Sequence, residues 1–247
     1  DIYVTTDKYK YYIYRGNMHT VSHQLENAIN DYKKALNHAE DDHQKVCTTR
    51  FVLGTLYEQT GNPTKAIDEY LKVLDYDHKQ QEVYIRLANI YAMEDAVPSA
   101  VETLERAIKE GFDTDNIREN LANLYLKNNQ PKKAGETTRD ELTKIKCLLT
   151  EGNTSEAFEA LTKAEEKYKD NPKLYSLKAE YYYLEKDFDK ALEAVAQYDK
   201  FQPNTALAFQ MKALIYDEKH DEFNSYLNWG KYNLARGNKD IAVNEFL

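Results

Sequence analysis

The sequence predicts an all-α solenoid of stacked helix-turn-helix repeats. A Leu-small-x-x-Tyr pattern recurs every 34 residues, at Leu53-Gly54-x-x-Tyr57, Leu87-Ala88-x-x-Tyr91 and Leu121-Ala122-x-x-Tyr125. A fixed period of this length is typical of repeats that stack on their neighbours to bury one continuous core. The 247 residues include only 8 glycines and 5 prolines, and no long stretch alternates with a period of two. Sheets and long loops are therefore not expected.

A second small residue follows the first by twelve positions, at Ala66, Ala100 and Ala134. Small residues on two helices let their backbones approach closely, so each repeat is expected to be one tight helix pair. The 21 tyrosines, many of them at repeat positions, suit a thin core because a tyrosine buries a large ring and keeps one polar tip.

The first repeat is expected over about residues 9–42 and the second over 47–80. In the second, Gly61-Asn62-Pro63 is expected to form the inter-helix turn, since Gly suits a helix end and Pro the first turn of a helix. The remaining repeats are expected over about 81–114, 115–137, 138–171, 172–205, 206–222 and 223–247, the last of them incomplete.

The repeat loses its phase twice, near residues 131–151 and near 219–225. Residues 131–151 would have to serve as the second helix of one repeat and the first helix of the next. One long or bent helix, or residues missing from the chain, would explain this slip, and the array could split into two parts there. At the second slip the next repeat starts only 17 residues on, so one helix is either absent or has changed its role.

This spacing resembles that of the tetratricopeptide repeat (TPR) family over about residues 9–247: 34 residues, an L-G/A-x-x-Y core and a later A-x3-F/Y. The resemblance implies a right-handed superhelix whose first helices line a concave groove, which in this family often binds an extended peptide. Groove positions carry over by their offset from the small residue. The candidates are Asn17, Thr55, Asn89, Asn123 and Glu180 directly after it, Phe51, Ile85 and Glu119 three before it, and Glu58 and Tyr183 four after it.

Three of these candidates are asparagines in one row: Asn17, Asn89 and Asn123. An Asn side chain both donates and accepts, so it can pair with a peptide backbone whatever the peptide's side chains are. The alternative is a solvated polar row without a ligand. Phe51 and Ile85 could form apolar pockets for a partner's side chains, or they could belong to the core.

TPR proteins that bind heat-shock chaperone tails hold an acidic C-terminus with a clamp of Lys, Arg and Asn. Here the Asn row matches one clamp position, but Phe51, Ile85 and Glu119 stand where the clamp lysine belongs. Arg86 is a lone match. The sequence therefore argues against a co-chaperone of this kind.

The other features of the chain make several function classes unlikely. The net charge is −9 with no basic run, which disfavours nucleic-acid binding, and no stretch approaches the roughly 20 apolar residues of a membrane span. No phosphate-binding loop or catalytic motif is present, so neither an enzyme nor a cofactor is expected. His19-x3-His23 has metal-ligand spacing but falls across an expected turn, where solvated histidines are the favoured interpretation.

Cys47 and Cys147 lie about three repeats apart, so a disulfide between them is not expected, and two thiols leave the compartment open. The chain starts at Asp1 and stops inside a helical pattern, which we interpret as a fragment of a longer protein, either cytoplasmic or, if a signal segment was removed, extracytoplasmic. Its Lys, Asn, Asp and Tyr content hints at a bacterial source.

The leading functional hypothesis is a scaffold that binds a protein or peptide segment in its groove. The alternative is a structural assembly protein that self-associates as a homo-oligomer, through its array ends or a Tyr-rich convex face. Two tyrosine clusters could form such a face: Tyr9, Tyr11, Tyr12 and Tyr14, and Tyr181, Tyr182 and Tyr183. Tyr12 and Tyr182 occupy repeat positions and are expected in the core.

Overall fold

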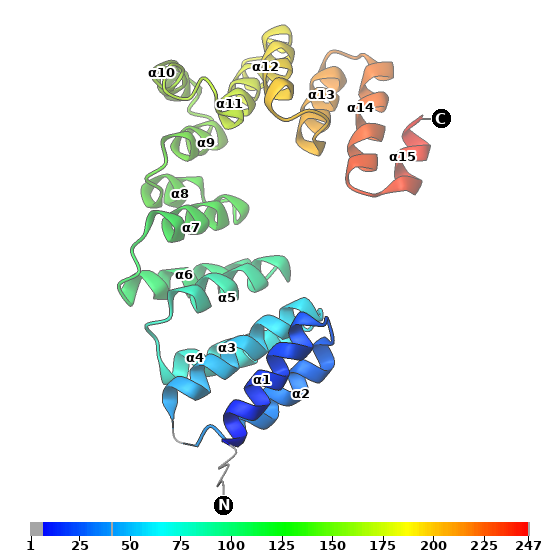
Figure 1. Ribbon diagram of the computed structural model, residues 1–247. Helices are drawn as coiled ribbons and strands as arrows, with labels where there is room; N and C mark the ends of the chain where they lie inside the picture. The colour runs from blue at the N-terminus through cyan, green and yellow to red at the C-terminus, as the bar shows by residue number, and fades with distance from the viewer. Residues whose placement is uncertain (1–6, 41, 247) are drawn as a thin grey trace, which may run out of the picture. The chain divides into compact units, whose positions relative to one another are not determined.

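The computed structural model describes residues 7–40 and 42–246, which form fifteen α-helices and no strand (Figure 1). The all-α prediction is confirmed. The chain divides into two compact units, residues 1–128 and 129–247. The repeat boundaries expected from the sequence stay predictions, and the two units are described separately below.

The first unit holds seven helices, and each packs against the next one along the chain (Figure 1). They are α1 (Lys8–Val21), α2 (Leu25–Leu36), α3 (His43–Gln59), α4 (Pro63–Tyr76), α5 (Gln81–Met93), α6 (Val97–Lys109) and α7 (Asp115–Lys127). Among them, α1 packs on α2, α3 on α4 and α5 on α6, and each pair contacts the helix that follows it.

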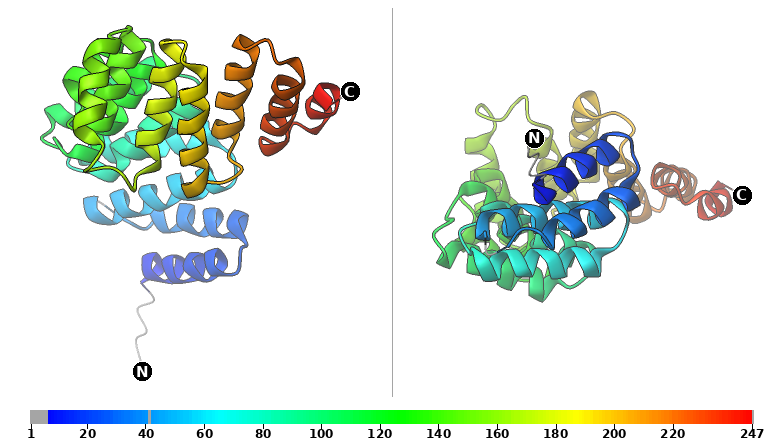
Figure 2. Two further views of the ribbon diagram at one scale, coloured as in Figure 1. Left: turned by 90° about the horizontal axis from the view of Figure 1, so that it is seen from above. Right: turned by 60° about the horizontal axis from the view of Figure 1, so that its bottom comes forward.

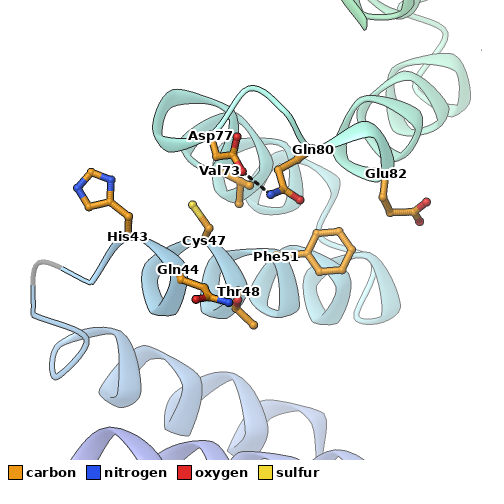
Figure 3. Close-up of a pocket in the computed structure, with 9 residues that line it drawn as sticks. All are labelled: His43, Gln44, Cys47, Thr48, Phe51, Val73, Asp77, Gln80 and Glu82. Atoms are coloured by element: carbon orange, nitrogen blue, oxygen red, sulfur yellow. Dashed lines mark hydrogen bonds between the residues drawn. The ribbon is translucent and has the colours of Figure 1, made fainter. Parts of the chain in front are cut away.

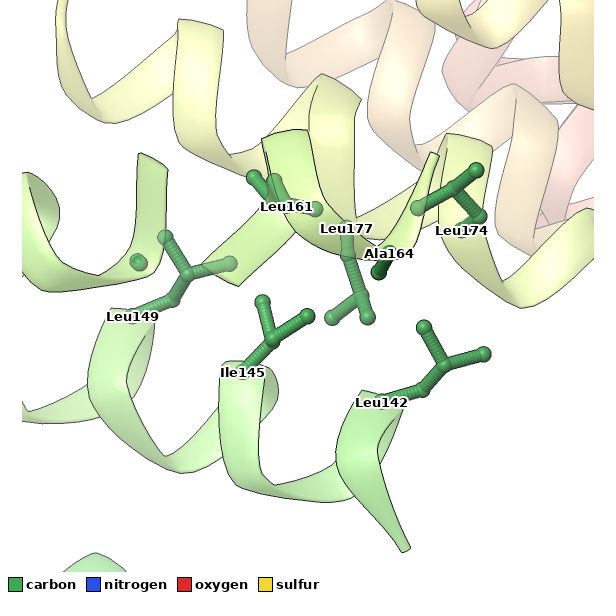
Figure 4. Close-up of a cluster of buried hydrophobic side chains, with 8 residues drawn as sticks. Leu142, Ile145, Leu149, Leu161, Ala164, Leu174 and Leu177 are labelled. Atoms are coloured by element: carbon green, nitrogen blue, oxygen red, sulfur yellow. The ribbon is translucent and has the colours of Figure 1, made fainter. Parts of the chain in front are cut away.

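The second unit holds eight helices (Figure 2). They are α8 (Pro131–Thr137), α9 (Glu141–Glu151), α10 (Thr154–Ala164), α11 (Pro172–Leu184), α12 (Phe188–Phe201), α13 (Ala206–Glu218), α14 (Glu222–Ala235) and α15 (Lys239–Phe246). A cluster of buried hydrophobic side chains joins α9, α10 and α11, with Ile145, Leu149, Leu161 and Leu177 among its members (Figure 4).

In several helix pairs, a small residue on the first helix is matched with a larger residue sixteen positions later on the second. In the first two pairs the small residue is glycine and the larger one is tyrosine. A Cβ atom built on Gly16 would lie 3.1 Å from the ring of Tyr32, and one built on Gly54 would lie 2.5 Å from the ring of Tyr70. At Gly54 only glycine leaves room for the tyrosine ring, whereas at Gly16 an added methyl group would require the Tyr32 ring to shift by a few tenths of an ångström.

In later pairs the first residue is larger than glycine and the second is smaller than tyrosine. Ala88 faces Leu104 at the same offsets, and both are buried. Further along, Ala179 is matched with Val195, again buried. In these four pairs a larger first residue is accompanied by a smaller second one, as expected where the total volume between the helices is kept; the pair α13–α14 departs from this, with Trp229 sixteen residues after Ala213.

The turn after the first helix also keeps its register. A residue with positive φ stands seven positions after the small residue in each case: His23, Gly61, Asp95, Asn129, Lys186 and His220. Only one of them is glycine. The other five are polar or charged residues, which adopt a positive φ less readily than glycine does. This turn also explains why His19 and His23 do not share a helical face, because α1 ends at Val21 and His23 lies outside it.

At the first phase slip, residues 131–151 do not form one long or bent helix, and that interpretation was wrong. They form two short helices, α8 and α9, separated by residues 138–140. Thr138 is extended and buried, and the Asp140 side chain accepts a hydrogen bond from the backbone N–H of Thr143 to start α9. The slip arises because α8 has only 7 residues.

At the second slip no helix is absent between residues 206 and 246. Helix α14 packs against both α13 and α15. It follows the His220 turn as a second helix would, and it precedes the Gly237 turn as a first helix would, with Gly230 seven residues before that turn. One helix therefore has both roles, and that is why a new repeat seems to start after half a period.

In the first pair, a salt bridge replaces apolar packing. Arg15 stands where later repeats have Leu53 and Leu87, and its guanidinium donates two hydrogen bonds of 2.6 Å to the buried carboxylate of Asp31. His19 Nε2 lies 3.7 Å from the same carboxylate. Hydrogen bonds from Arg15 hold the pKa of Asp31 below its usual value, against the opposing effect of burial.

Replacing Gly54 with Ala should lower the free energy of unfolding by about 1–3 kcal/mol, since the added methyl group meets the Tyr70 ring. In a Tyr70→Leu background the pair would match Ala88 and Leu104, so the same replacement should cost much less. Urea unfolding followed by circular dichroism measures the loss of unfolding free energy in both backgrounds. Gly135→Ala is the control, because its Cβ would meet Cys147 only at 3.5 Å. An equal loss in both backgrounds would contradict the size-matching account.

Replacing Asp31 with Asn should destabilise the protein at pH 7 and matter less in acid. A carboxyl whose pKa is lowered on folding contributes stability above its unfolded pKa, near 4, and that contribution is lost as the pH falls through the folded value. The difference in unfolding free energy between the native chain and Asp31→Asn should therefore shrink as the pH is lowered from 7 to 3. A difference that does not change with pH would show that the ion pair has no such role.

Candidate functional site

The row of residues that directly follow the small residues lies on the exposed side of the first helices. Asn89 on α5 and Asn123 on α7 are both exposed, and neither has a hydrogen-bond partner among the residues that the structure describes. Both line a hollow of about 220 Å³ in the first unit. Its apolar lining includes Ile85 and Leu104, the latter from the second helix α6. Three candidate residues, Ile85, Asn89 and Asn123, are thus brought together around one hollow.

The remaining asparagine of the row is partly used within the protein. Asn17 is exposed on α1, but its side-chain oxygen accepts a hydrogen bond of 2.5 Å from the Tyr32 hydroxyl. Only its NH₂ group is left for a ligand. Glu119 is half-buried on α7, one turn before Asn123.

Phe51 lines a second hollow in the first unit, of about 590 Å³, formed by α3, the end of α4 and the start of α5 (Figure 3). Its ring lies 5.9 Å from that of Tyr70, centroid to centroid, and the Arg86 guanidinium lies 5.5 Å from its centre. In Figure 3 the Cys47 sulfur faces Asp77 across this hollow. Burial and the nearby Asp77 raise the pKa of the Cys47 thiol, so it is not an activated nucleophile.

Thr55 and Glu58 belong to a polar network beneath that hollow. The buried Tyr70 hydroxyl donates a hydrogen bond to Glu58 and lies 3.3 Å from the Thr55 hydroxyl. Arg86 Nη1 lies 3.3 Å from Glu58 Oε1, and its Nε lies 2.9 Å from Glu82. Burial, together with the bond to Glu58, raises the pKa of Tyr70. Arg86, the lone clamp match, is therefore already neutralised by two carboxylates of its own unit.

The second unit has a hollow of different chemistry, of about 540 Å³, lined by α11 and α13 with Lys146 from α9. Both candidates of this unit, Glu180 and Tyr183, line it, and Lys146 Nζ pairs with Glu180 Oε1 at 2.6 Å. The rest of the lining is mostly apolar: Leu177, Ala179, Leu184, Leu207, Met211, Leu214 and Ile215.

Three leucines of this hollow are unusually open to solvent. Leu184 and Leu207 are each 43% exposed and Leu214 is 37% exposed. Leu184 and Leu207 were not among the candidates from the sequence. The available signal was the spacing of Leu207, Met211 and Leu214 at i, i+4 and i+7, which puts all three on one face of α13.

The remaining chemical candidates have ordinary local roles. His19 Nδ1 lies 2.7 Å from the Gln24 side-chain oxygen. Within residues 7–40 and 42–246, no group of three or more His, Cys, Asp or Glu side chains is placed to hold a metal ion. Cys47 and Cys147 do not form a disulfide with each other. In the same residues, every helix is too short or too polar to cross a bilayer.

The comparisons with known proteins agree on one family. Models described as tetratricopeptide repeat match residues 10–79, 51–116 and 148–215. None of the curated proteins compared with the chain matches it.

Three solved structures illustrate the likeness of fold. A tetratricopeptide repeat protein from Parabacteroides merdae has a TM-score of 0.81 at 15% identity, with 96% of this chain and 97% of that chain covered. PilW, described as a widely conserved type IV pilus biogenesis factor, has a TM-score of 0.59 at 16% identity over 80% of this chain and 98% of its own. PilF of Pseudomonas aeruginosa has a TM-score of 0.54 at 16% identity, with 97% of this chain and 96% of that chain covered.

At these identities the structures show a shared fold and nothing about ligands. The fold itself is informative, because TPR arrays are generally non-enzymatic scaffolds for protein–protein interaction. Three family models, the helix pairs with their small-residue contacts and the turns in constant register lead to the same conclusion. The chain belongs to the tetratricopeptide repeat family.

Proposed function

We propose that this chain is a binding module that holds a protein segment against the exposed sides of its first helices. The observation that carries the proposal is the pair of asparagines, Asn89 and Asn123, at the rim of one hollow with no partner in the described part of the chain. Unpaired amides on neighbouring helices offer two donor–acceptor groups to a ligand.

The spacing of these amides suits an extended backbone. Both asparagines line one hollow, so a single extended segment, which rises about 3.3 Å per residue, would reach both amides. Contacts of this kind hold the backbone irrespective of side chains, and the hollow between them, with Ile85 and Leu104, would take one apolar side chain of the ligand.

In the second unit the proposed contact is apolar. The exposed leucines on α11 and α13 would bury aliphatic side chains of a protein partner, while the Lys146–Glu180 pair supplies a polar edge. A hollow of several hundred Å³ with an apolar lining and a few polar groups is the usual form of a ligand site. We infer a protein partner and not a nucleic acid, since 42 acidic residues outnumber 33 basic ones.

The sequence also allowed a homo-oligomer as an alternative. That alternative needs an exposed apolar face outside the two groove surfaces, and both α1 and α14 carry exposed large apolar side chains.

Replacing Asn89 and Asn123 together with Ala should weaken binding about tenfold to a hundredfold, since each lost hydrogen bond contributes about 1 kcal/mol. The probe is a linear peptide selected from a phage-displayed library on the native chain, titrated by calorimetry. The matched control is Asn30→Ala, an exposed asparagine on α2. Unchanged affinity in the double variant, or an equal loss with Asn30→Ala, would exclude the amide row as the site.

Replacing Leu207 and Leu214 together with Ser should reduce capture of the second unit's partner without unfolding the chain, because both side chains are already about two-fifths exposed. Capture is measured by quantitative mass spectrometry of proteins retained from a cell lysate by native and variant chains. Leu234→Ser on α14, 53% exposed, is the control. If every retained protein binds the double variant as it binds the native chain, the apolar hollow is not a binding surface.

A further inference from the structure

The hollow of the second unit runs lengthwise along two helices. On α11 its lining begins at Lys173 and ends at Leu184, and on α13 it begins at Leu207 and ends at Ile215. Within each helix the lining residues recur mostly at intervals of three and four, so they belong to one helix face. At about 1.5 Å per residue, the two walls are roughly 12 to 17 Å long.

One end and the middle of this hollow are electrically neutral. At the start of α11, Lys173 Nζ lies 3.0 Å from Asp140 Oδ2. In the middle, Lys146 Nζ lies 2.6 Å from Glu180 Oε1. Each of these cations is therefore balanced by a carboxylate of its own unit.

The other end of the hollow, where α11 and α13 end, is acidic. Burial raises the pKa of the Tyr183 hydroxyl, and the nearby negative charges of Glu218 and Asp217 raise it further. Both carboxylates are exposed, and neither has an ion-pair partner in the described part of the unit. Asp217 accepts its hydrogen bonds from neutral side chains of α14, and the adjacent Lys219 is paired with Asp189. The last carbonyls of two helices add partial negative charge at the same end.

A helix matches the shape and polarity of the walls better than an extended segment does. An extended segment laid along them would bury unpaired backbone amides against apolar side chains, and the lining offers one side-chain amide, that of Gln210. A helix pairs its own backbone groups. Its side chains at i, i+3, i+4 and i+7 form a ridge that packs into the furrow between two other helices.

We propose that the second unit binds an amphipathic helix that carries aliphatic side chains along one face and Lys or Arg in its first turn. The aliphatic face covers Leu184, Leu207 and Leu214, and the basic first turn lies over Asp217 and Glu218. The N-terminus of a helix is the positive end of its dipole, so this direction adds to the same attraction. The inference rests on the proposed function, because it names the partner of the apolar hollow.

Selection from displayed peptides tests the class of partner. Two phage libraries of equal length are mixed and selected on the native chain, one with leucines fixed at helical spacing in a helix-forming background, the other random and linear. Clones that no longer bind Leu207→Ser/Leu214→Ser are sequenced. They should come from the helical library and carry Lys or Arg in the first turn.

The two ways of failing are distinguishable. Leucine-dependent clones that come from the linear library, or that lack a basic first turn, would overturn this inference and leave the hollow as a binding surface. If no clone from either library depends on Leu207 and Leu214, the hollow is not a binding surface, and the proposed function of the second unit fails with the inference.

Charge reversal tests the acidic end. The best helical clone is synthesised and titrated into native and variant chains by fluorescence anisotropy. Glu218→Lys should weaken binding about tenfold, because a repulsion replaces an attraction, and added salt should weaken binding to the native chain. The matched control is Glu159→Lys, an exposed glutamate on the second helix α10, which should bind like the native chain. An equal loss in both variants would overturn the placement of the basic turn.

A proline scan of the same peptide tests its conformation. Proline at a solvent-facing position in the middle of the peptide should weaken binding about a hundredfold, since it breaks a helix without removing a contact with the hollow. Alanine at that position is the control and should leave the affinity unchanged. Undiminished binding of the proline peptide would show that the segment binds in an extended form, which overturns the proposal.

Discussion

The contact between a small residue on the first helix and a larger residue sixteen positions later limits how closely the pairs α1–α2 and α3–α4 pack. Where the first is glycine, as at Gly54, the second can be a tyrosine, and where it is alanine, as at Ala88, the second is a leucine. Interiors tolerate exchanges of this kind because total volume is kept, whereas a methyl added to one side alone has nowhere to go. The positive-φ turn stands seven residues after the small residue even where the turn residue is histidine or lysine.

This constraint leaves the outward residues free to differ between the two units. The residue directly after the small one lies about 100° around the helix from the contact; in the first two pairs it still reaches the tyrosine hydroxyl, through Asn17 and Thr55, whereas Asn89 and Asn123 make no such bond in the described part of the chain. In the first unit that freedom gives the amides of Asn89 and Asn123, and in the second it gives an ion pair beside exposed leucines. One scaffold thus presents two surfaces of different chemistry, which is the usual relation between a repeat fold and its functions.

Much of this was predictable from the sequence wherever the 34-residue period held. Asn89 and Asn123 lie around one hollow because they share one offset on consecutive first helices, and Ile85 lies one turn before Asn89 on the same helix. Prediction failed where one element had an abnormal length or role. The period could not show that α8 is only 7 residues long, or that α14 belongs to two helix pairs. The open leucines of the second unit, Leu184 and Leu207, were missed for another reason, because apolar residues on a helix are ordinarily assigned to the core and their exposure depends on the neighbouring helices.

The central claim is that the small-residue contact orients the first helices so that Asn89 and Asn123 together present a binding surface. The most direct measurement is of their side-chain amide resonances in ¹⁵N-labelled protein, assigned by single Asn→Ala variants, during titration with the selected linear peptide. The account predicts that both amide pairs shift and saturate at the same peptide concentration, while the Asn30 amide stays unchanged. Shifts confined to Asn30 or to residues of second helices, with Asn89 and Asn123 unmoved, would contradict it.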